Sequence, residues 1–126
     1  MKPHSPLTLE EFQHAQNNIL GSVIRKPPVP LNVALADTEI YLKLENLQPI
    51  GSFKLRGAIN AMRSADPKKL EAGVWTASMG NMAQGVAWGA RELGVQATVV
   101  VREEPTRDKF SDMETPGARI TKIPQN

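Results

Sequence analysis

The stretch Glu39–Met62, EIYLKLENLQPIGSFKLRGAINAM, contains a predicted strand, a loop and a helix in that order. Apolar and polar residues alternate from Ile40 to Glu45, which indicates a half-buried strand. Loop-forming residues then break the alternation: Asn46, Gln48, Pro49 and Gly51. Ser52 is a suitable N-cap for the helix that follows. Apolar residues recur in that helix at helical spacing: Leu55, Ala58, Ile59 and Met62.

Lys54 falls in the first turn of this predicted helix. The unpaired N–H groups and the dipole of a helix N-terminus disfavour positive charge there. We therefore expect the neutral amine, which is a nucleophile, to be favoured at Lys54. Most lysines in a first helical turn are simply exposed, so Lys54 alone is a weak indication of a catalytic site.

The composition predicts one small soluble globular domain: 126 residues, 40% hydrophobic and 22% charged. The net charge of +2 comes from scattered basic residues, so no nucleic-acid partner is expected. The chain has no Cys, and its histidines, His4 and His14, form no convincing metal cluster, so no metal site is predicted. No apolar run is long enough to span a membrane, and no signal-peptide core is present, which predicts a cytoplasmic protein without a membrane partner.

The first part of the chain predicts a capped helix followed by a connector. Thr8 and Glu11 form a capping box, an apolar stripe follows, and Gly21 is a suitable helix end. The proline-rich segment 26–30 cannot be helical and is expected to be an extended, polyproline-like linker across the surface. A proline-motif ligand is the less favoured interpretation of that segment.

From residue 66 onward, strands and helices alternate in the prediction. After a turn at Asp66-Pro67, the expected elements are a helix at 67–72, a strand at 74–76, a helix at 82–93, a strand at 97–101, a helix at 106–114 and a strand at 118–123. This order predicts a parallel, doubly wound sheet, and the continuous apolar run 97–101 predicts a strand covered on both faces. Gly85 and Gly89 are expected to allow close packing of their helix on the sheet.

The loop Ser78–Asn81 is a candidate anion cradle, because it joins a predicted strand to a helix N-terminus. Ligands of parallel α/β sheets bind at the carboxyl ends of the strands, which is where this loop lies. Alone the signal is weak, since many such loops are only tight turns. No GxGxxG or Walker A pattern is present, so dinucleotide and nucleoside triphosphate binding gain no support.

Two motifs together resemble a known family. They are Lys43-Leu44-Glu45-Asn46 followed by Gly51-Ser52-Phe53-Lys54-Leu55-Arg56-Gly57-Ala58, and Ala77-Ser78-Met79-Gly80-Asn81-Met82-Ala83-Gln84-Gly85-Val86-Ala87. The pair resembles the fold-type II pyridoxal-phosphate-dependent enzymes, in particular the threonine and serine dehydratase (threonine ammonia-lyase) branch, which includes serine racemases. The implied fold is α/β, a three-layer parallel sheet of the tryptophan-synthase-beta-like type, incomplete here. Residues 1–65 would be the N-terminal part of the large cofactor domain and residues 66–126 a partial small domain.

The resemblance also implies a role for each matching residue. Lys54 would bind pyridoxal 5′-phosphate covalently and later move the α-proton of the substrate, with Phe53 against the cofactor ring. Asn81 would hydrogen-bond the 3′-oxygen of that ring. Ser78, together with the backbone of Gly80 and Asn81, would receive the substrate carboxylate.

Some features depart from the family pattern. Met79 stands where racemases carry a serine that serves the opposite face, which disfavours racemisation, and Met82 stands where a histidine is common. The resemblance places the glycine-rich phosphate cup and the group facing the pyridine nitrogen beyond residue 126. With most of the large-domain core absent, some apolar residues are expected to lack burial partners: Leu42, Leu44, Leu55 and Ile59.

The implied function is a lyase that deaminates a small hydroxyamino acid, threonine or serine, to a 2-oxo acid and ammonia. A chain of this length is expected to be inactive by itself, as the N-terminal portion of such an enzyme. The alternatives are a non-catalytic α/β binding or interaction module and another enzyme of the family such as a serine racemase. The expected partner is a small amino-acid substrate, and the family also suggests a homo-oligomer.

Overall fold

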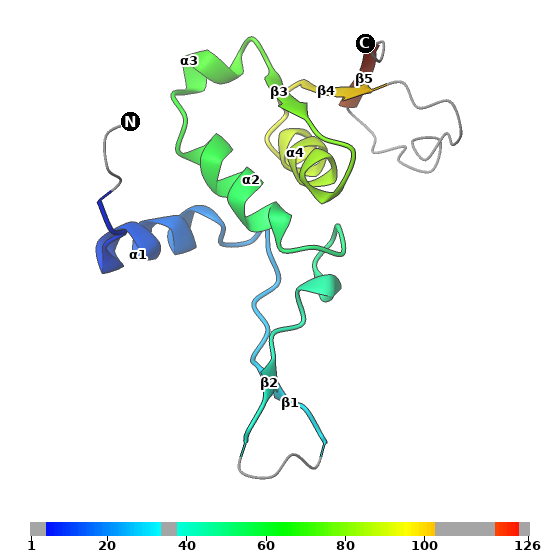
Figure 1. Ribbon diagram of the computed structural model, residues 1–126. Coiled ribbons are helices and arrows are strands. Elements are labelled where there is room, and N and C mark those ends of the chain that lie inside the picture. The colour runs from blue at the N-terminus through cyan, green and yellow to red at the C-terminus, as the bar shows by residue number, and fades with distance from the viewer. Residues whose placement is uncertain (1–4, 34–37, 103–117, 124–126) are drawn as a thin grey trace.

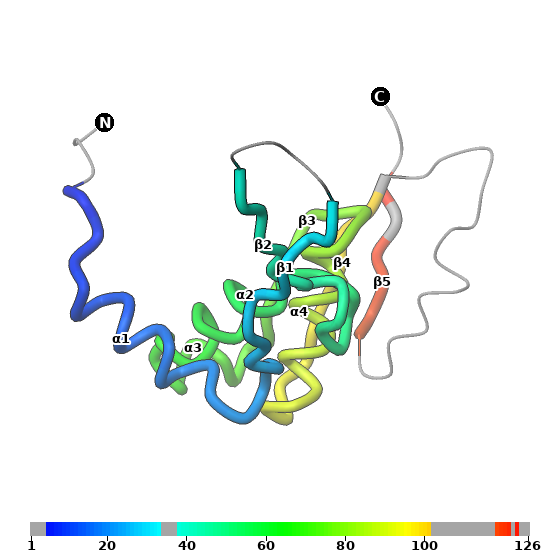
Figure 2. Tube along the Cα trace, turned by 90° about the horizontal axis from the view of Figure 1, so that it is seen from below, coloured from blue at the N-terminus to red at the C-terminus, as the bar shows by residue number. Residues whose placement is uncertain are grey.

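Two helices, α2 (Lys54–Arg63) and α4 (Asn81–Glu92), occupy the centre of the computed structural model, which describes residues 5–33, 38–102 and 118–123. Helix α1 (Leu9–Asn18) lies on one side of this pair and a three-stranded sheet on the other (Figure 1, Figure 2). The short helix α3 (Pro67–Leu70) follows α2, and the side chain of Asp66 caps it by accepting from the Lys68 N–H. The mixed helices and strands confirm the predicted α/β class.

The sheet consists of β3 (Val74–Ala77), β4 (Ala97–Arg102) and β5 (Ala118–Ile123). Its strands are parallel, as predicted, and they lie in the order β3-β4-β5. Helix α4 connects β3 to β4 and packs on the face that carries Val99 and Val101. On the other face Thr98 is buried, but Val100 is only half-buried and Trp75, the partner of Thr98 on β3, is 70% exposed, so the prediction that both faces of β4 are covered is not confirmed. The helix predicted at 106–114 lies outside the described residues.

Helices α2 and α4 pack closely because two glycines of α4, Gly85 and Gly89, have no side chain to hold the helices apart. A Cβ placed on Gly85 would lie 3.3 Å from the carbonyl oxygen of Lys54, and one on Gly89 would lie 2.8 Å from Cδ1 of Ile59. The prediction that these glycines pack on the sheet is therefore wrong, since they face another helix. Leu55 and Ile59 were predicted to lack burial partners, and this is also wrong, because both are 0% exposed.

A two-stranded arm projects from the helices (Figure 1). It pairs β1 (Val29–Pro30) with β2 (Tyr41–Leu42) in antiparallel fashion. The segment 26–30, predicted to be an unpaired linker, therefore contributes a strand. The predicted strand Ile40–Glu45 is wrong beyond Leu42, because the chain turns into a 3₁₀ helix, η1 (Glu45–Leu47). Leu42 is exposed and Leu44 half-buried, so they carry little of the core.

Helix α1 begins with the predicted capping box. Glu11 N–H donates to Thr8 Oγ1 at 3.2 Å, and Thr8 N–H donates to a Glu11 carboxylate oxygen at 2.7 Å. No residue of α1 is buried, and an open cavity of about 580 Å³ lies between α1 and α2. The helix is therefore held by its ends and by polar contacts more than by an apolar face.

Arg63 at the end of α2 supplies the main polar contacts to the end of α1. Its guanidinium donates to the carbonyl oxygens of Asn18 at 2.6 Å and Leu20 at 3.1 Å, and to Ser22 Oγ at 2.6 Å. Ser22 in turn donates to Glu92 of α4 at 2.8 Å. These bonds join the C-terminal ends of the three helices.

Over the ranges that the structure describes, no helix has the length and apolar composition to cross a membrane.

Candidate active site

Lys54 is the first residue of α2, as predicted. Its N–H donates to the Oγ of Ser52 at 3.2 Å, and Ser52 is only 5% exposed. The hydroxyl thus satisfies one of the N–H groups that a helix start leaves unpaired. The N-cap is Phe53, so the prediction that Ser52 is the N-cap is wrong by one residue, although the Ser52 hydroxyl still accepts from the first N–H of the helix.

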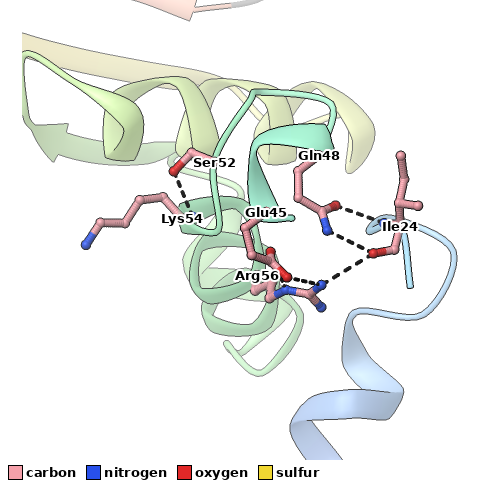
Figure 3. Close-up of polar contacts among 6 residues, drawn as sticks. All are labelled: Ile24, Glu45, Gln48, Ser52, Lys54 and Arg56. Atoms are coloured by element: carbon pink, nitrogen blue, oxygen red, sulfur yellow. Dashed lines mark hydrogen bonds and ion pairs between the residues drawn. The ribbon is translucent and has the colours of Figure 1, made fainter. Parts of the chain in front are cut away.

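The side chain of Lys54 extends away from the neighbouring charged groups (Figure 3). Its Nζ lies 4.9 Å from the centroid of the Phe53 ring, which is 56% exposed. Among residues 5–33, 38–102 and 118–123, no carboxylate lies within ion-pair distance of the Lys54 amine. The amine and the adjacent ring therefore form a small, accessible unit at the helix start.

The loop Ser78–Asn81 leaves the N-terminus of α4 open. Gly80 is the N-cap and offers no side chain to the first-turn N–H groups, while its own N–H donates to Ser78 Oγ at 3.3 Å. A Cβ placed on Gly80 would meet nothing within 4 Å. Gly80 and Asn81 are exposed and Ser78 is half-buried. Backbone donors, helix dipole and open space together suit an anionic group.

The packing of α2 on α4 brings these two regions to the same side of the molecule. Gly85 faces Lys54 and Leu55, and one turn later Gly89 faces Ile59 and Met62. Because later residues of α4 contact later residues of α2, the two helices run in the same direction, and their N-terminal ends lie on one side. Lys54 and the Ser78–Asn81 loop, separate in sequence, therefore flank a common region.

The methionines of the second motif have different surroundings. Met79 is 41% exposed in the loop. Met82 is half-buried and packs against the core cluster that contains Ala58 and Met62. Met82 therefore contributes to the packing between α2 and α4, whereas the side chain of Met79 is exposed beside the open N-terminus of α4.

A set of contacts that the sequence did not predict surrounds the loop before Lys54. Arg56 Nε and Nη2 each donate to a carboxylate oxygen of Glu45 at 2.8 Å. The Gln48 side chain accepts from the Ile24 N–H at 2.9 Å and donates to the Ile24 carbonyl at 2.8 Å (Figure 3). Hydrogen bonds from Arg56 lower the pKa of the Glu45 carboxyl below its usual value of 4.5. No local pattern marks these partners, because Ile24 is distant in sequence.

Comparison with known proteins identifies the family. Residues 21–126 match the family described as pyridoxal-phosphate dependent enzyme. The chain belongs to this family. Serine racemase of Dictyostelium discoideum is 39% identical over 125 residues, 97% of this chain and 38% of that protein. Mitochondrial threonine dehydratase of Schizosaccharomyces pombe is 42% identical over 101 residues, 78% of this chain and 17% of that protein.

Solved structures of the family share the fold. The structure of Dictyostelium discoideum serine racemase matches with a TM-score of 0.86 and 35% identity, covering 95% of this chain and 40% of that one. That of the processed form of threonine deaminase isoform 2 from Solanum lycopersicum matches with a TM-score of 0.72 and 31% identity, covering 99% and 38%. The family confirms the predicted fold type, and the chain spans less than half the length of these relatives.

The described residues fit the family's cofactor, pyridoxal 5′-phosphate. An accessible lysine amine suits the aldehyde of pyridoxal phosphate, and the exposed Phe53 ring can lie against a flat heteroaromatic group. The uncapped start of α4 suits an anionic oxygen or carboxylate. Within the described ranges, no group of three or more potential ligand residues is placed to hold a metal ion.

Proposed function

We propose that this chain carries the lysine and the carboxylate-binding loop of a lyase that deaminates threonine or serine to a 2-oxo acid and ammonia. The observation that carries the proposal is the placement of Lys54 and the Ser78–Asn81 loop at the same end of two packed helices. The threonine dehydratase and threonine deaminase relatives support this reaction class.

In this proposal each residue has a distinct task. Ser78 and the backbone N–H groups of Gly80 and Asn81 bind the substrate carboxylate and so fix the orientation of its α-carbon. The amine of Lys54 takes the proton from that carbon, after which the β-hydroxyl leaves. Phe53 and Asn81 hold the cofactor ring and its 3′-oxygen. When bound, pyridoxal phosphate supplies an electron sink for the charge left on the α-carbon.

A serine racemase is the second candidate, supported by the 39% identity to the Dictyostelium discoideum enzyme. Racemisation needs a proton donor on the face opposite the lysine. The thioether of Met79 carries no transferable proton, which favours the lyase. A non-catalytic binding module remains the alternative from another class.

Reductive labelling tests the cofactor role of Lys54. The chain is incubated with pyridoxal phosphate, reduced with borohydride, digested and mapped by mass spectrometry. We expect a pyridoxyl adduct at Lys54 that disappears in Lys54→Ala and persists in Lys68→Ala, where the lost lysine lies on α3. A folded wild-type chain without the adduct would contradict the proposal.

Product analysis then separates the candidate reactions. Ammonia and a 2-oxo acid formed from L-threonine or L-serine, and lost in Lys54→Ala, would support the lyase. Formation of D-serine without ammonia would support the racemase. Because a chain of this length is expected to be inactive by itself, cofactor capture without turnover would support the role of Lys54 but would not distinguish the lyase from a binding module.

The division into residues 1–65 and 66–126, the homo-oligomer and the cytoplasmic location are further parts of this proposal. The packing of α2 on α4 joins the two proposed parts in this structure. One relative is named mitochondrial, so fractionation of the tagged protein is the appropriate test of location.

A further inference from the structure

We infer that Gln48, Glu45 and Arg56 are positioning residues for Lys54, an inference that rests on the proposed function of that lysine. Together with the backbone of Ile24, they form a frame around the loop that leads into α2 (Figure 3). None of the three is needed to touch substrate or cofactor in this role.

The Glu45–Arg56 pair closes the loop at its two ends. Glu45 begins η1, and Arg56 lies in the first turn of α2, two residues after Lys54. Two parallel N–H···O bonds of 2.8 Å fix both the distance and the mutual orientation of these elements. The pair is mostly shielded, with the side chains 26% and 19% exposed.

Gln48 ties the middle of the loop to a distant segment. Its side-chain amide accepts from the Ile24 N–H and donates to the Ile24 carbonyl, and Gln48 is only 5% exposed. Arg56 also donates to the Ile24 carbonyl at 3.3 Å, so the same oxygen links the two parts of the frame. A buried polar group that loses its partner destabilises the fold by more than the hydrogen bond contributed, because the group stays buried without any partner. The loop is therefore restricted to the conformation that keeps these bonds.

The turn that follows Gln48 leads directly to Lys54. Gly51 has a positive φ of 65° and donates to the Gln48 carbonyl at 2.8 Å, so the turn before Ser52 is built on Gln48. Ser52 then receives the Lys54 N–H. Loosening Gln48 should therefore change the direction from which Lys54 enters the site.

Gln48→Ala and Gln48→Glu provide the test on the full chain. Glutamate keeps the size and the acceptor of glutamine, but it replaces the donor with a carboxylate oxygen that faces the Ile24 carbonyl, so it breaks the frame without removing packing. Gln96→Ala is the matched control, because Gln96 is exposed beside β4 and its side chain makes no hydrogen bond to another described residue. Hydrogen exchange of residues 46–56 and the rate of pyridoxyl labelling of Lys54 are measured in each variant.

We expect loop exchange to rise about tenfold and Lys54 labelling to slow several-fold in Gln48→Ala, with at least as large an effect in Gln48→Glu, whose buried carboxylate would face the Ile24 carbonyl oxygen. Exchange in α4 and the control variant should be unchanged. Unchanged loop exchange, unchanged labelling, or wild-type behaviour of Gln48→Glu would overturn the inference. A wild-type chain that is not labelled at Lys54 contradicts the proposed function instead, and loop exchange alone then decides whether the frame exists.

Discussion

At Gly73 the backbone has a positive φ of 85°, and an added Cβ would lie 2.8 Å from the Gln96 carbonyl oxygen. Gly94 has a φ of 67° but open space around it. We expect Gly94→Ala to lower the free energy of unfolding by about 1 to 2 kcal/mol through backbone strain alone. Gly73→Ala should cost at least about 1 kcal/mol more, because main chain must move. Urea unfolding of both variants measures the difference, and equal losses would refute the predicted clash.

The lowered pKa of Glu45 predicts how acid affects stability. A carboxyl whose pKa is lower in the folded than in the unfolded chain stabilises the fold above the unfolded pKa, and this is lost as the pH falls through the folded one. The wild type should therefore exceed Glu45→Gln in free energy of unfolding at neutral pH. This difference should shrink progressively as the pH falls below 4.5, the usual pKa of the carboxyl. Unfolding curves at several pH values test this. Parallel pH profiles of the two proteins would show that the pair contributes no pH dependence.

The individual residues show which contacts a sequence can reveal. The capping box of Thr8 and the position of Lys54 follow from partners within a few residues, so both were predicted correctly. Gln48 was predicted only as a loop residue, because its partner Ile24 lies 24 positions away. The catalytic and binding roles assigned to Lys54 and the Ser78–Asn81 loop remain predictions that labelling must test.

Helix α1 depends on polar contacts at its C-terminal end more than on its own apolar face, since it buries no residue. Arg63 donates to the Asn18 carbonyl and to two oxygens just beyond the helix, and the Asn18 side chain donates to Asn60 and Ser64. In Arg63→Met we expect amide exchange in α1 to rise at least about tenfold while exchange in α4 stays slow. Arg91→Met, which changes an exposed arginine of α4, is the control. Equal protection of α1 in both variants would show that other contacts hold it.

The elements also show what periodicity cannot tell. The strands β3, β4 and β5 and the helix α4 between β3 and β4 were predicted from apolar runs and from glycines at element ends. Apolar spacing indicated that Leu55 and Ile59 face a core, but their burial partner could not be deduced from it. The partner is α4, whose glycines let the two helices pack closely. The spacing of apolar residues does not show which helix will pack against which. The pairing of β1 with β2 was missed for a related reason, since Pro30 breaks the strand pattern.

For the whole molecule, stability should be concentrated between α2 and α4. Ile59 is 0% exposed, so Ile59→Ala should cost about 2 to 5 kcal/mol and lower the denaturation midpoint of the entire chain. Leu9→Ala removes a similar side chain that is 73% exposed on α1, and it should cost much less. Circular dichroism in urea measures both. Similar midpoints for the two variants would argue that the helix pair is not the core.

The close seam between α2 and α4 also limits how this protein can be recombined with its relatives. A chimera that joins residues 1–65 to the second part of another enzyme would place a foreign helix against α2. Any side chain larger than hydrogen at the positions of Gly85 or Gly89 would then push against Lys54 or Ile59. Successful exchanges should therefore transfer α2 and α4 together, as one inherited module, even though they lie on opposite sides of the proposed boundary.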